Sequence, residues 1–414
     1  MKIGAFCELY DVSRDTVRFY VKNGLLAPKV QGSRMEFSQK DRDDLEFIIK
    51  LKGMKFSLEE INNFMFLRRM ASMTDPATLN QCLELLVRKK NEIAMLREQL
   101  DKSIAQINEE IREITIRKNS TSKGISGVPL RCVEMLYCPK CRKQLNVEDA
   151  HIASKYIISG ALTCECGYCA GIQNGIVRTG NVYTGAHDMP DLERKLYHDT
   201  GSEFNTAALR CTDYMREKIG KMDLRGKTVF EANINGFFFT YNFLSSLPHD
   251  VTYIIVDKYA ETLEKYKSNI ESQFQGLDIL YIADAGETLP LAPRCIDLYL
   301  ALFGENEYGF YHKQCQIHDI HECLKEDSQI IGAYIGLPPQ SESRVRLRKK
   351  YPEGMDRMLD PRDFAEEYRR NGFRLIMEKM GVAVKTLKHH MYTEHVNGEP
   401  LTLYAYCGDR GNRE

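Results

Sequence analysis

A seven-residue repeat of apolar residues, within one long helical pattern over residues 76–118, restricts the fold of this chain more than any other feature. One seam of this segment carries these residues at intervals of seven: Leu86, Ile93, Leu100, Ile107 and Ile114. Such a repeat is typical of a left-handed coiled coil, because it keeps the apolar seam facing a partner helix. Lys90 and Arg97 interrupt the companion seam. We therefore expect a coiled coil, with packing against the chain's own C-terminal domain as the alternative.

The pattern changes several times along the 414 residues, which are too many for one ordinary core. We distinguish a segment of short helices and turns (1–75), the long helix (76–118), a polar linker rich in Ser and Gly (119–129), a cysteine-rich segment with short strands (130–180), and alternating strands and helices (190–410). The alternation in the last segment favours a parallel sheet with crossover helices. The sequence thus predicts a multidomain protein.

Charge and hydropathy limit where the protein acts and what it binds. The net charge of -1 gives no overall basic field, so any contact with nucleic acid must come from a local basic patch. The start, MKIGAFCELYDVSRD, lacks the pattern of a secretory signal. No apolar run approaches the roughly 20 residues that a membrane span needs. We expect a cytoplasmic protein with no membrane contact.

The first segment contains two short helices joined by a tight turn. Apolar residues at helical spacing over 3–9 form the first, and Ser13 is a suitable N-cap for the second, which Asn23 and Gly24 end. This is the helix-turn-helix arrangement, in which the second helix enters the major groove of DNA. Arginines at its exposed positions can bond phosphates or guanine edges.

The sequence DVSRDTVRFYVKNGLLAPKVQGSRMEFSQKDRDDLEFIIKLKGMKFSLEEI resembles the DNA-binding domain of the MerR family. The resemblance covers the VSRDTVRFY recognition helix, the NGLL-x-P exit, the F-S-x-x-D wing exit and the KGMKFSLEEI pair of helices. It implies a winged helix-turn-helix fold and a homodimer on an inverted repeat of double-stranded promoter DNA, which the protein distorts. It also implies RNA polymerase as a partner at the promoter, and antiparallel pairing of the helix over 76–118 with its twin.

The same resemblance assigns roles to individual residues. Arg14 and Thr16 would contact DNA from the recognition helix, and Arg18 and Tyr20 would approach the DNA backbone. The alternative for Arg18 and Tyr20 is that they only hold the two helices together. In the wing the family arginine is displaced by one place, so that Arg34 is the residue that could reach a phosphate.

Five closely spaced cysteines indicate a metal site rather than disulfides. Cys138 and Cys141 form one pair, and the other two thiolates come from among Cys164, Cys166 and Cys169. Four thiolates suit a closed, structural Zn²⁺ site, and the second pair could be Cys164 with Cys166 or Cys166 with Cys169. The stretch resembles small zinc ribbons that precede methyltransferase domains, where the C-x-C-G pair binds the metal, which favours Cys164 with Cys166. A redox or metal-sensing role is the alternative.

Three strand patterns in the last segment end in acids, over residues 227–231, 251–257 and 278–284, and two further strand patterns cover 296–302 and 329–335. In such folds ligands bind at the carboxyl ends of the strands. The order resembles class I S-adenosylmethionine-dependent methyltransferases, which implies a Rossmann-like α/β domain and S-adenosylmethionine as cofactor. By position, Glu231 begins the cofactor loop, Asp257 takes the ribose hydroxyls and Asp284 lies near the adenine.

The cofactor loop departs from the family pattern. The family has three alternate glycines after the first acid, whereas this chain reads EANINGF over residues 231–237. Asn233, Asn235 and Gly236 would contact the cofactor there, and Phe237 occupies the last glycine position. Glycine serves in such loops because backbone can then approach the ligand closely and take positive φ. No residue of the segment stands out as a catalytic base.

Three functions are compatible with these features. The first is a DNA-binding transcription regulator whose methyltransferase-like domain senses a small molecule or S-adenosylmethionine, and the lost glycines favour it. The second is an active S-adenosylmethionine-dependent methyltransferase with a DNA-binding head, which the retained acids favour. The third is a dimerising scaffold without a ligand.

Overall fold

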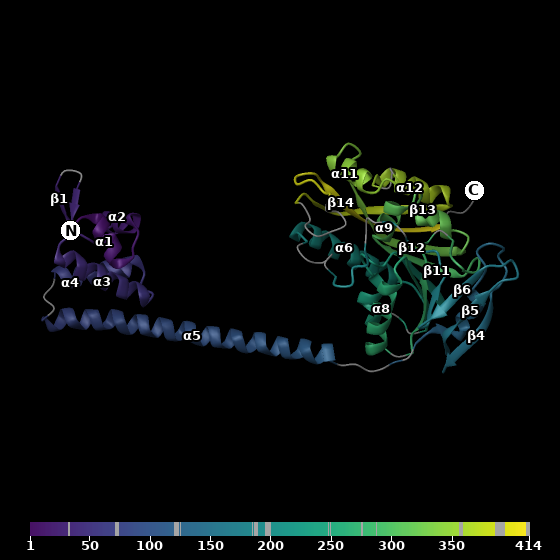
Figure 1. The fold of residues 1–414 in the computed structure, drawn as a ribbon, viewed down its shortest axis with the longest axis horizontal. Coiled ribbons are helices and arrows are strands. Elements are labelled where there is room, and N and C mark those ends of the chain that lie inside the picture. Colours follow the sequence, from purple (N-terminus) through teal and green to yellow (C-terminus); the bar gives the residue numbers. More distant parts are fainter. Residues whose placement is uncertain are drawn as a thin grey trace. The chain divides into compact units, whose positions relative to one another are not determined.

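The structure, a computed structural model, describes residues 1–31, 34–70, 74–119, 124, 126–183, 185, 189–194, 200–246, 248, 250–274, 276–286, 288–355, 359–385 and 394–410. The chain divides into two compact units, residues 1–119 and residues 120–414 (Figure 1). None of the described helices combines the length and the apolar character that crossing a bilayer requires.

The first unit begins with a helix-turn-helix. Its elements in chain order are α1 (Ile3–Tyr10), α2 (Arg14–Lys22), β1 (Lys29–Gln31), β2 (Arg34–Glu36), α3 (Gln39–Gly53), α4 (Leu58–Met70) and α5 (Pro76–Asn119). The Ser13 hydroxyl accepts the backbone N–H of Thr16 at 3.0 Å, which is the N-cap that the sequence predicts. β1 and β2 pair antiparallel as the wing. The expected winged helix-turn-helix is therefore confirmed.

Arg69 on α4 fixes the exit of the recognition helix α2. Its guanidinium lies 2.7 Å from the Asp44 carboxylate on α3 and donates to the backbone carbonyls of Gly24 and Leu25 at 3.0 and 2.5 Å. Asp44 is buried, so this ion pair is shielded from solvent. The contact holds the C-terminal end of α2 against the second helical pair, which sets the orientation of the recognition helix.

The long helix α5 presents its apolar seam to solvent. The five residues of the seven-residue repeat are 36–60 % exposed, from Leu86 to Ile114. Among the described side chains of α5, those near its start pack against the rest of its unit, where Cys82 is buried in the same core as Phe6 and Leu45. A continuous exposed seam of this length is unusual for a surface that has no partner.

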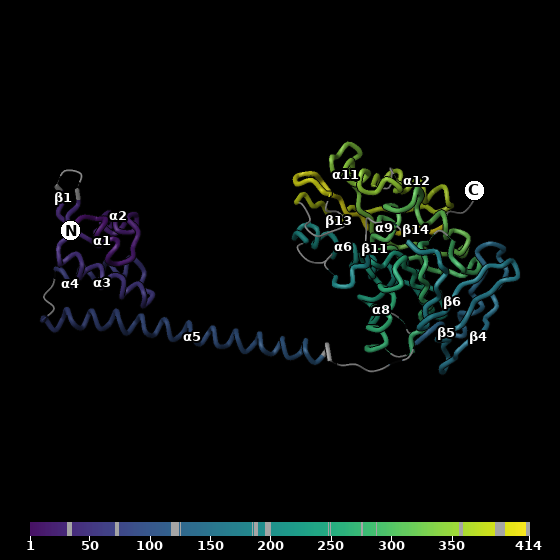
Figure 2. Tube along the Cα trace, viewed as in Figure 1, coloured from purple at the N-terminus to yellow at the C-terminus, as the bar shows by residue number. Residues whose placement is uncertain are grey.

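The second unit is built on one large sheet. Its strands in chain order are β3 (Val128–Pro129), β4 (Asn146–Ala153), β5 (Tyr156–Thr163), β6 (Cys169–Gln173), β7 (Ile176–Arg178), β8 (Lys227–Ala232), β9 (Val251–Asp257), β10 (Asp278–Ala283), β11 (Ile296–Leu302), β12 (Leu324–Gly336), β13 (Phe373–Ala383) and β14 (Leu401–Arg410). The order in space is β13-β14-β12-β11-β8-β9-β10-β7-β6-β5-β3, with β4 beside β5. The strands β4, β5 and β6 lie side by side (Figure 2). The five strands predicted from the sequence are β8 to β12.

The strands β12, β11, β8, β9 and β10 run parallel. Numbered by their sequence, their order is the 3-2-1-4-5 of a Rossmann-like sheet, with the switch of direction between β8 and β11. β14 lies antiparallel between β12 and β13. The α/β Rossmann-like fold class expected for this region is confirmed by this order.

Both faces of the parallel strands are covered by helices. The helices and short 3₁₀ turns are η1 (Leu130–Met135), α6 (Ser202–Ile219), α7 (Phe239–Phe243), η3 (Leu244–Ser246), α8 (Ala260–Gln273), α9 (Gly304–Tyr311), α10 (Gln316–Ile320), α11 (Glu342–Lys350) and α12 (Pro361–Arg370). In β9, Tyr253 and Ile255 pack on one face with α6 and α8, while Ile254 and Val256 pack on the other with α10 and α12. Burial on both faces explains the continuous apolar run of β9.

The cysteine-rich segment is continuous with the main sheet. β6 pairs antiparallel with β7, and β7 pairs parallel with β10, in register Tyr281 with Ile176. The apolar face of this segment shares its core with the parallel strands, as Cys132, Leu136 and Leu162 show. The sequence pattern indicates that residues 130–180 form a segment of their own. In the structure, the strands of this segment extend the sheet of the α/β domain.

Candidate functional site

The recognition helix α2 exposes its arginines. Arg14 and Arg18 are exposed, and Arg18 lies 3.9 Å from Asp15 on the same helix. The hydroxyl of Thr16, half-buried, shares a hydrogen bond with that of Ser13. Exposed arginines at the start of a docked helix can bond phosphates and base edges, and a solvent-exposed ion pair costs little to break on binding.

Tyr20 lies in a different environment from the arginines of α2. Its side chain is 3 % exposed and belongs to the core of the first unit. This burial supports the packing role that was the alternative for Tyr20. The backbone of Arg34 lies in β2, but its side chain is outside the described ones, as are residues 32 and 33.

Four cysteine sulfurs converge between the turn after η1 and the end of β5. The Sγ atoms of Cys138, Cys141, Cys164 and Cys166 all lie within 4.8 Å of one another. Cys138 and Cys166 are 3.4 Å apart, and Cys141 and Cys164 are 3.3 Å apart. Among the residues that the structure describes, Cys169 is outside this group and begins β6.

This geometry and donor set fit a tetrahedral metal ion. Zn–S bonds of about 2.3 Å place sulfurs in a tetrahedron about 3.8 Å apart, close to the separations seen here. Burial opposes ionisation of Cys138, but hydrogen bonds from the backbone of Cys141, the thiol of Cys166 and the backbone of Lys140 together lower the pKa of Cys138 to about 7. Four thiolates leave no open position, so the site suits a structural ion. These residues could hold Zn²⁺ and tie the turn after η1 to the end of β5.

The candidate cofactor residues lie at or just beyond the carboxyl ends of the parallel strands, a region that we call the carboxyl edge (residues 179–183, 231–238, 257–259, 284–286 and 303–312). Glu231, the second-to-last residue of β8, is buried. Its two carboxylate oxygens accept the backbone N–H groups of Phe239 and Thr240 at 2.7 and 2.8 Å. Burial raises the pKa of Glu231 to about 7. Glu231 therefore holds the end of the cofactor loop.

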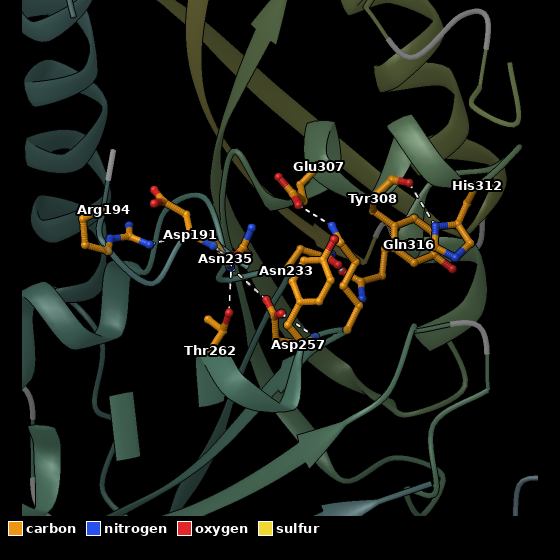
Figure 3. Close-up of polar contacts among 12 residues, drawn as sticks. Asp191, Arg194, Asn233, Asn235, Asp257, Thr262, Glu307, Tyr308, His312 and Gln316 are labelled. Carbon is orange, nitrogen blue, oxygen red and sulfur yellow. Dashed lines mark hydrogen bonds and ion pairs between the residues drawn. The ribbon is translucent and has the colours of Figure 1, made fainter. Parts of the chain in front are cut away.

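The cofactor loop is occupied by contacts within the chain (Figure 3). Asn233 takes a φ of 57°, the conformation for which the family uses glycine, and its side chain donates to Gln316 at 3.0 Å. The Asn235 side-chain oxygen accepts from the backbone of Asp191 at 2.9 Å and from the Thr262 hydroxyl at 3.1 Å. Asparagine thus supplies the backbone shape of glycine but fills the space that glycine leaves.

Both carboxylate oxygens of Asp257 are engaged. They accept the backbone N–H of Asn235 at 2.8 Å and of Tyr259 at 2.8 Å. Arg194 lies over the same loop and donates to the backbone carbonyls of Asn235 and Gly236 at 2.7 and 2.6 Å (Figure 3). The sequence places Asp257 at this edge for ribose hydroxyls, but it gives no sign of Arg194.

The carboxylate of Asp284 accepts hydrogen bonds from residues that follow β7 and from its own loop. Its carboxylate accepts from the Thr179 hydroxyl at 2.5 Å, from the Asn181 side chain at 3.1 Å and from the backbone of Gly286 at 2.6 Å. Thr179 and Asn181 reach this edge because β7 runs parallel to β10. No pattern in the sequence indicates this pairing, since β7 has only three residues.

The crevice at the switch point is closed by α9. Gly304, the first residue of α9, packs so closely that a Cβ there would lie 2.7 Å from the Ala232 carbonyl oxygen. The Phe237 and Phe303 rings meet edge to face at 5.0 Å. The five candidate side chains, those of Glu231, Asn233, Asn235, Asp257 and Asp284, are 1–7 % exposed. In this arrangement the carboxyl edge does not fit S-adenosylmethionine unless the loop over residues 233–237 moves.

Comparison with known families identifies the first part of the first unit. Residues 1–66 match the model of the MerR HTH family regulatory proteins. The N-terminal region is therefore a MerR-type helix-turn-helix domain, as the sequence predicted. A search of curated proteins finds no match to the chain.

Solved structures similar to this chain include methyltransferases. Haemonchus contortus phosphoethanolamine N-methyltransferase 2, in complex with S-adenosyl-L-methionine, is 11 % identical with a TM-score of 0.35, over 49 % of this chain and 52 % of that one. Geranyl diphosphate C-methyltransferase from Streptomyces coelicolor A3(2) is 9 % identical with a TM-score of 0.36, over 54 % of this chain and 87 % of that one. The match thus spans about half the length of the Haemonchus enzyme.

Proposed function

We propose that this chain is a DNA-binding transcription regulator whose α/β domain senses a small molecule and does not transfer methyl groups. The observation that carries the sensor role is the engagement of Asp257 by the backbone of Asn235 and Tyr259. An enzyme gains rate from groups that are already placed for the transition state. Here Asp257 must give up two hydrogen bonds, and the loop over residues 233–237 must move, before a cofactor can bind.

The same engagement suits a sensor. A ligand shifts an equilibrium only through its different affinity for two states. A closed loop held by Arg194 and Asp191, and an open loop that frees Asp257, would be two such states. Ligand binding would then be coupled to movement of the loop, which could be transmitted along the chain to the DNA-binding head (residues 1–75).

The test is the effect of S-adenosylmethionine on DNA binding by the full chain. We expect binding of the ligand by calorimetry to be lost in Asp257→Ala and kept in Asp213→Ala, an exposed acid of α6 that serves as the control. A gel shift at fixed salt then reports whether the ligand changes DNA affinity. If no small molecule changes DNA affinity and a labelled methyl group is transferred, the sensor proposal is wrong.

Active methyl transfer is the second candidate. It is favoured by the arrangement of Glu231, Asp257 and Asp284 at the carboxyl edge of adjacent parallel strands. The labelled-methyl assay separates it from the sensor role, because a sensor binds without turnover.

We further propose that the protein acts as a homodimer on promoter DNA, with RNA polymerase as its partner there. The exposed seam of α5 supports pairing with a second copy, since no described residue covers it. Arg14, Thr16, Arg18 and Arg34 are the proposed DNA contacts. Zn²⁺ bound by Cys138, Cys141, Cys164 and Cys166 is the proposed structural ion.

A further inference from the structure

A buried lysine follows Asp257 at the carboxyl edge. The side chain of Lys258 is 5 % exposed, and its ammonium forms an ion pair with Glu307 on α9, which is 2 % exposed. The two residues are 49 positions apart in the chain. Figure 3 shows Glu307 pointing into the group of polar side chains that surrounds the cofactor loop.

Three tyrosine rings surround the ammonium of Lys258. Nζ lies 4.1 Å from the ring centroid of Tyr311, 5.1 Å from that of Tyr259 and 5.7 Å from that of Tyr183. Tyr183 meets Tyr259 at 89° and Tyr311 at 64°, both edge to face. The rings come from three separate segments: the stretch after β7, the stretch after β9 and the end of α9. We call Tyr183, Tyr259, Tyr311 and Glu307 the cation cage.

Folding alone gives no reason for this arrangement. Burying an ammonium costs several kcal/mol, and apolar residues of the same volume often stabilise a core as well as a buried ion pair does. Aromatic faces around a cation are, however, the arrangement by which proteins recognise quaternary ammonium groups. The carboxylate of Glu307 adds the opposite charge.

The cage also lies where a ligand of this fold binds. Lys258 and Tyr259 directly follow Asp257, at the carboxyl end of β9, and Asp257 itself bonds the Tyr259 backbone. We infer that the cation cage is the ligand site of the sensor domain, that its ligand is a small quaternary ammonium compound, and that Lys258 fills it when the ligand is absent. This inference rests on the proposed sensor function and names the ligand class for that site.

Lys258 then acts as a competitor that is tethered to the site. The apparent affinity for a ligand falls by the fraction of molecules in which the site is open. If Lys258 occupies the cage roughly 90–99 % of the time, removing its ammonium should tighten ligand binding about 10- to 100-fold. Ligand binding to the native chain should in turn expel Lys258 from the cage and expose it.

The first experiment measures binding to the full chain by calorimetry. The probe is choline chloride, compared with the neutral isostere 3,3-dimethylbutan-1-ol at matched ionic strength. Lys258→Ala should bind choline at least about tenfold more tightly than the parent. Lys221→Ala, which removes an exposed lysine paired with Glu217, should bind as the parent does. Adding Glu307→Gln to Lys258→Ala should remove the gain.

The second experiment uses the unaltered protein, so that it does not depend on folding of a variant. Acetylation of Lys258 by an amine-reactive ester, followed by mass spectrometry, should be slow without ligand and should accelerate with choline but not with its isostere. Exposed Lys221 should react at one rate throughout. Equal binding of choline and isostere by Lys258→Ala, or rapid acetylation of Lys258 without ligand, overturns the inference.

These outcomes are distinct from failure of the sensor proposal. A chain that ignores choline but still changes DNA affinity with another small molecule remains a sensor with a different ligand. A chain that binds choline without any change in DNA affinity has the cage but lacks the sensing role.

Discussion

Replacement of Glu231 by glutamine tests whether this buried acid holds the cofactor loop. It also tests whether the free-energy cost of burying the carboxyl group depends on pH. The pKa of Glu231 is raised by burial from 4.5 to about 7. This difference corresponds to about 3 kcal/mol between the protonated and ionised forms. The folded state holds the proton more tightly than the unfolded state, so its stability falls as pH rises from about 4.5 to about 7.

Glutamine removes the titration but also one acceptor. Its amide oxygen can accept only one of the two N–H groups, of Phe239 and Thr240, that Glu231 accepts, and an unsatisfied buried donor costs about 1–3 kcal/mol. Glu231→Gln should therefore be less stable than the parent by about that amount at pH 5. At pH 8, where the parent carries the cost of the buried charge, the variant should be equal or more stable.

The two proteins should thus change their order of stability between pH 5 and pH 8. We would measure this by urea unfolding of the full chain at pH 5, 6, 7 and 8, followed by hydrogen exchange of peptides from residues 227–246. Because these peptides belong to the second unit, their exchange does not report unfolding of the first unit. Glu217→Gln is the control, because Glu217 is exposed on α6 and pairs with Lys221. Parallel pH profiles for Glu231→Gln and the parent would refute the reasoning, since they would mean that Glu231 is not the titrating group.

Three further changes test the DNA-binding surface, the metal site and the dimer. Arg14→Ala and Arg18→Ala should each weaken operator binding by ~1–3 kcal/mol in a gel shift at fixed salt, and unchanged affinity would reject the contact. Cys138→Ser should lower the zinc content from one ion per chain to none by elemental analysis, whereas Cys169→Ser should keep the ion. Ile107→Asp should convert a dimer to a monomer in sedimentation, because a charge then lies in the apolar seam of α5; a variant that sediments as the parent does would place the interface elsewhere.

Local patterns in the sequence were sufficient for several parts of the fold. The Ser13 cap and the strands that carry Glu231 and Asp257 at or near their carboxyl ends depend on residues a few positions apart, whereas the wing is implied by the resemblance to the MerR family. Periodicity, caps and turn residues report such short-range structure. The same is true of the seven-residue period of α5, which is visible in the sequence alone.

Contacts between distant segments could not be read in this way. The choice between Cys166 paired with Cys164 and Cys166 paired with Cys169 depends on how β5 and β6 bring the sulfurs together. The Thr179 contact to Asp284 spans 105 residues, and it exists because the short strand β7 joins β10.

The sequence by itself determined that this chain begins with a MerR-type helix-turn-helix, continues in a long helix with an apolar seam, and ends in a Rossmann-like sheet with acids at its strand ends. Only the tertiary structure decided that those acids are bound by the chain's own backbone and that Lys258 lies in a cage of three tyrosines and Glu307. The physical reason is range: helix and strand patterns follow from neighbouring residues, whereas burial and pairing of a charge depend on segments that meet only in the folded protein.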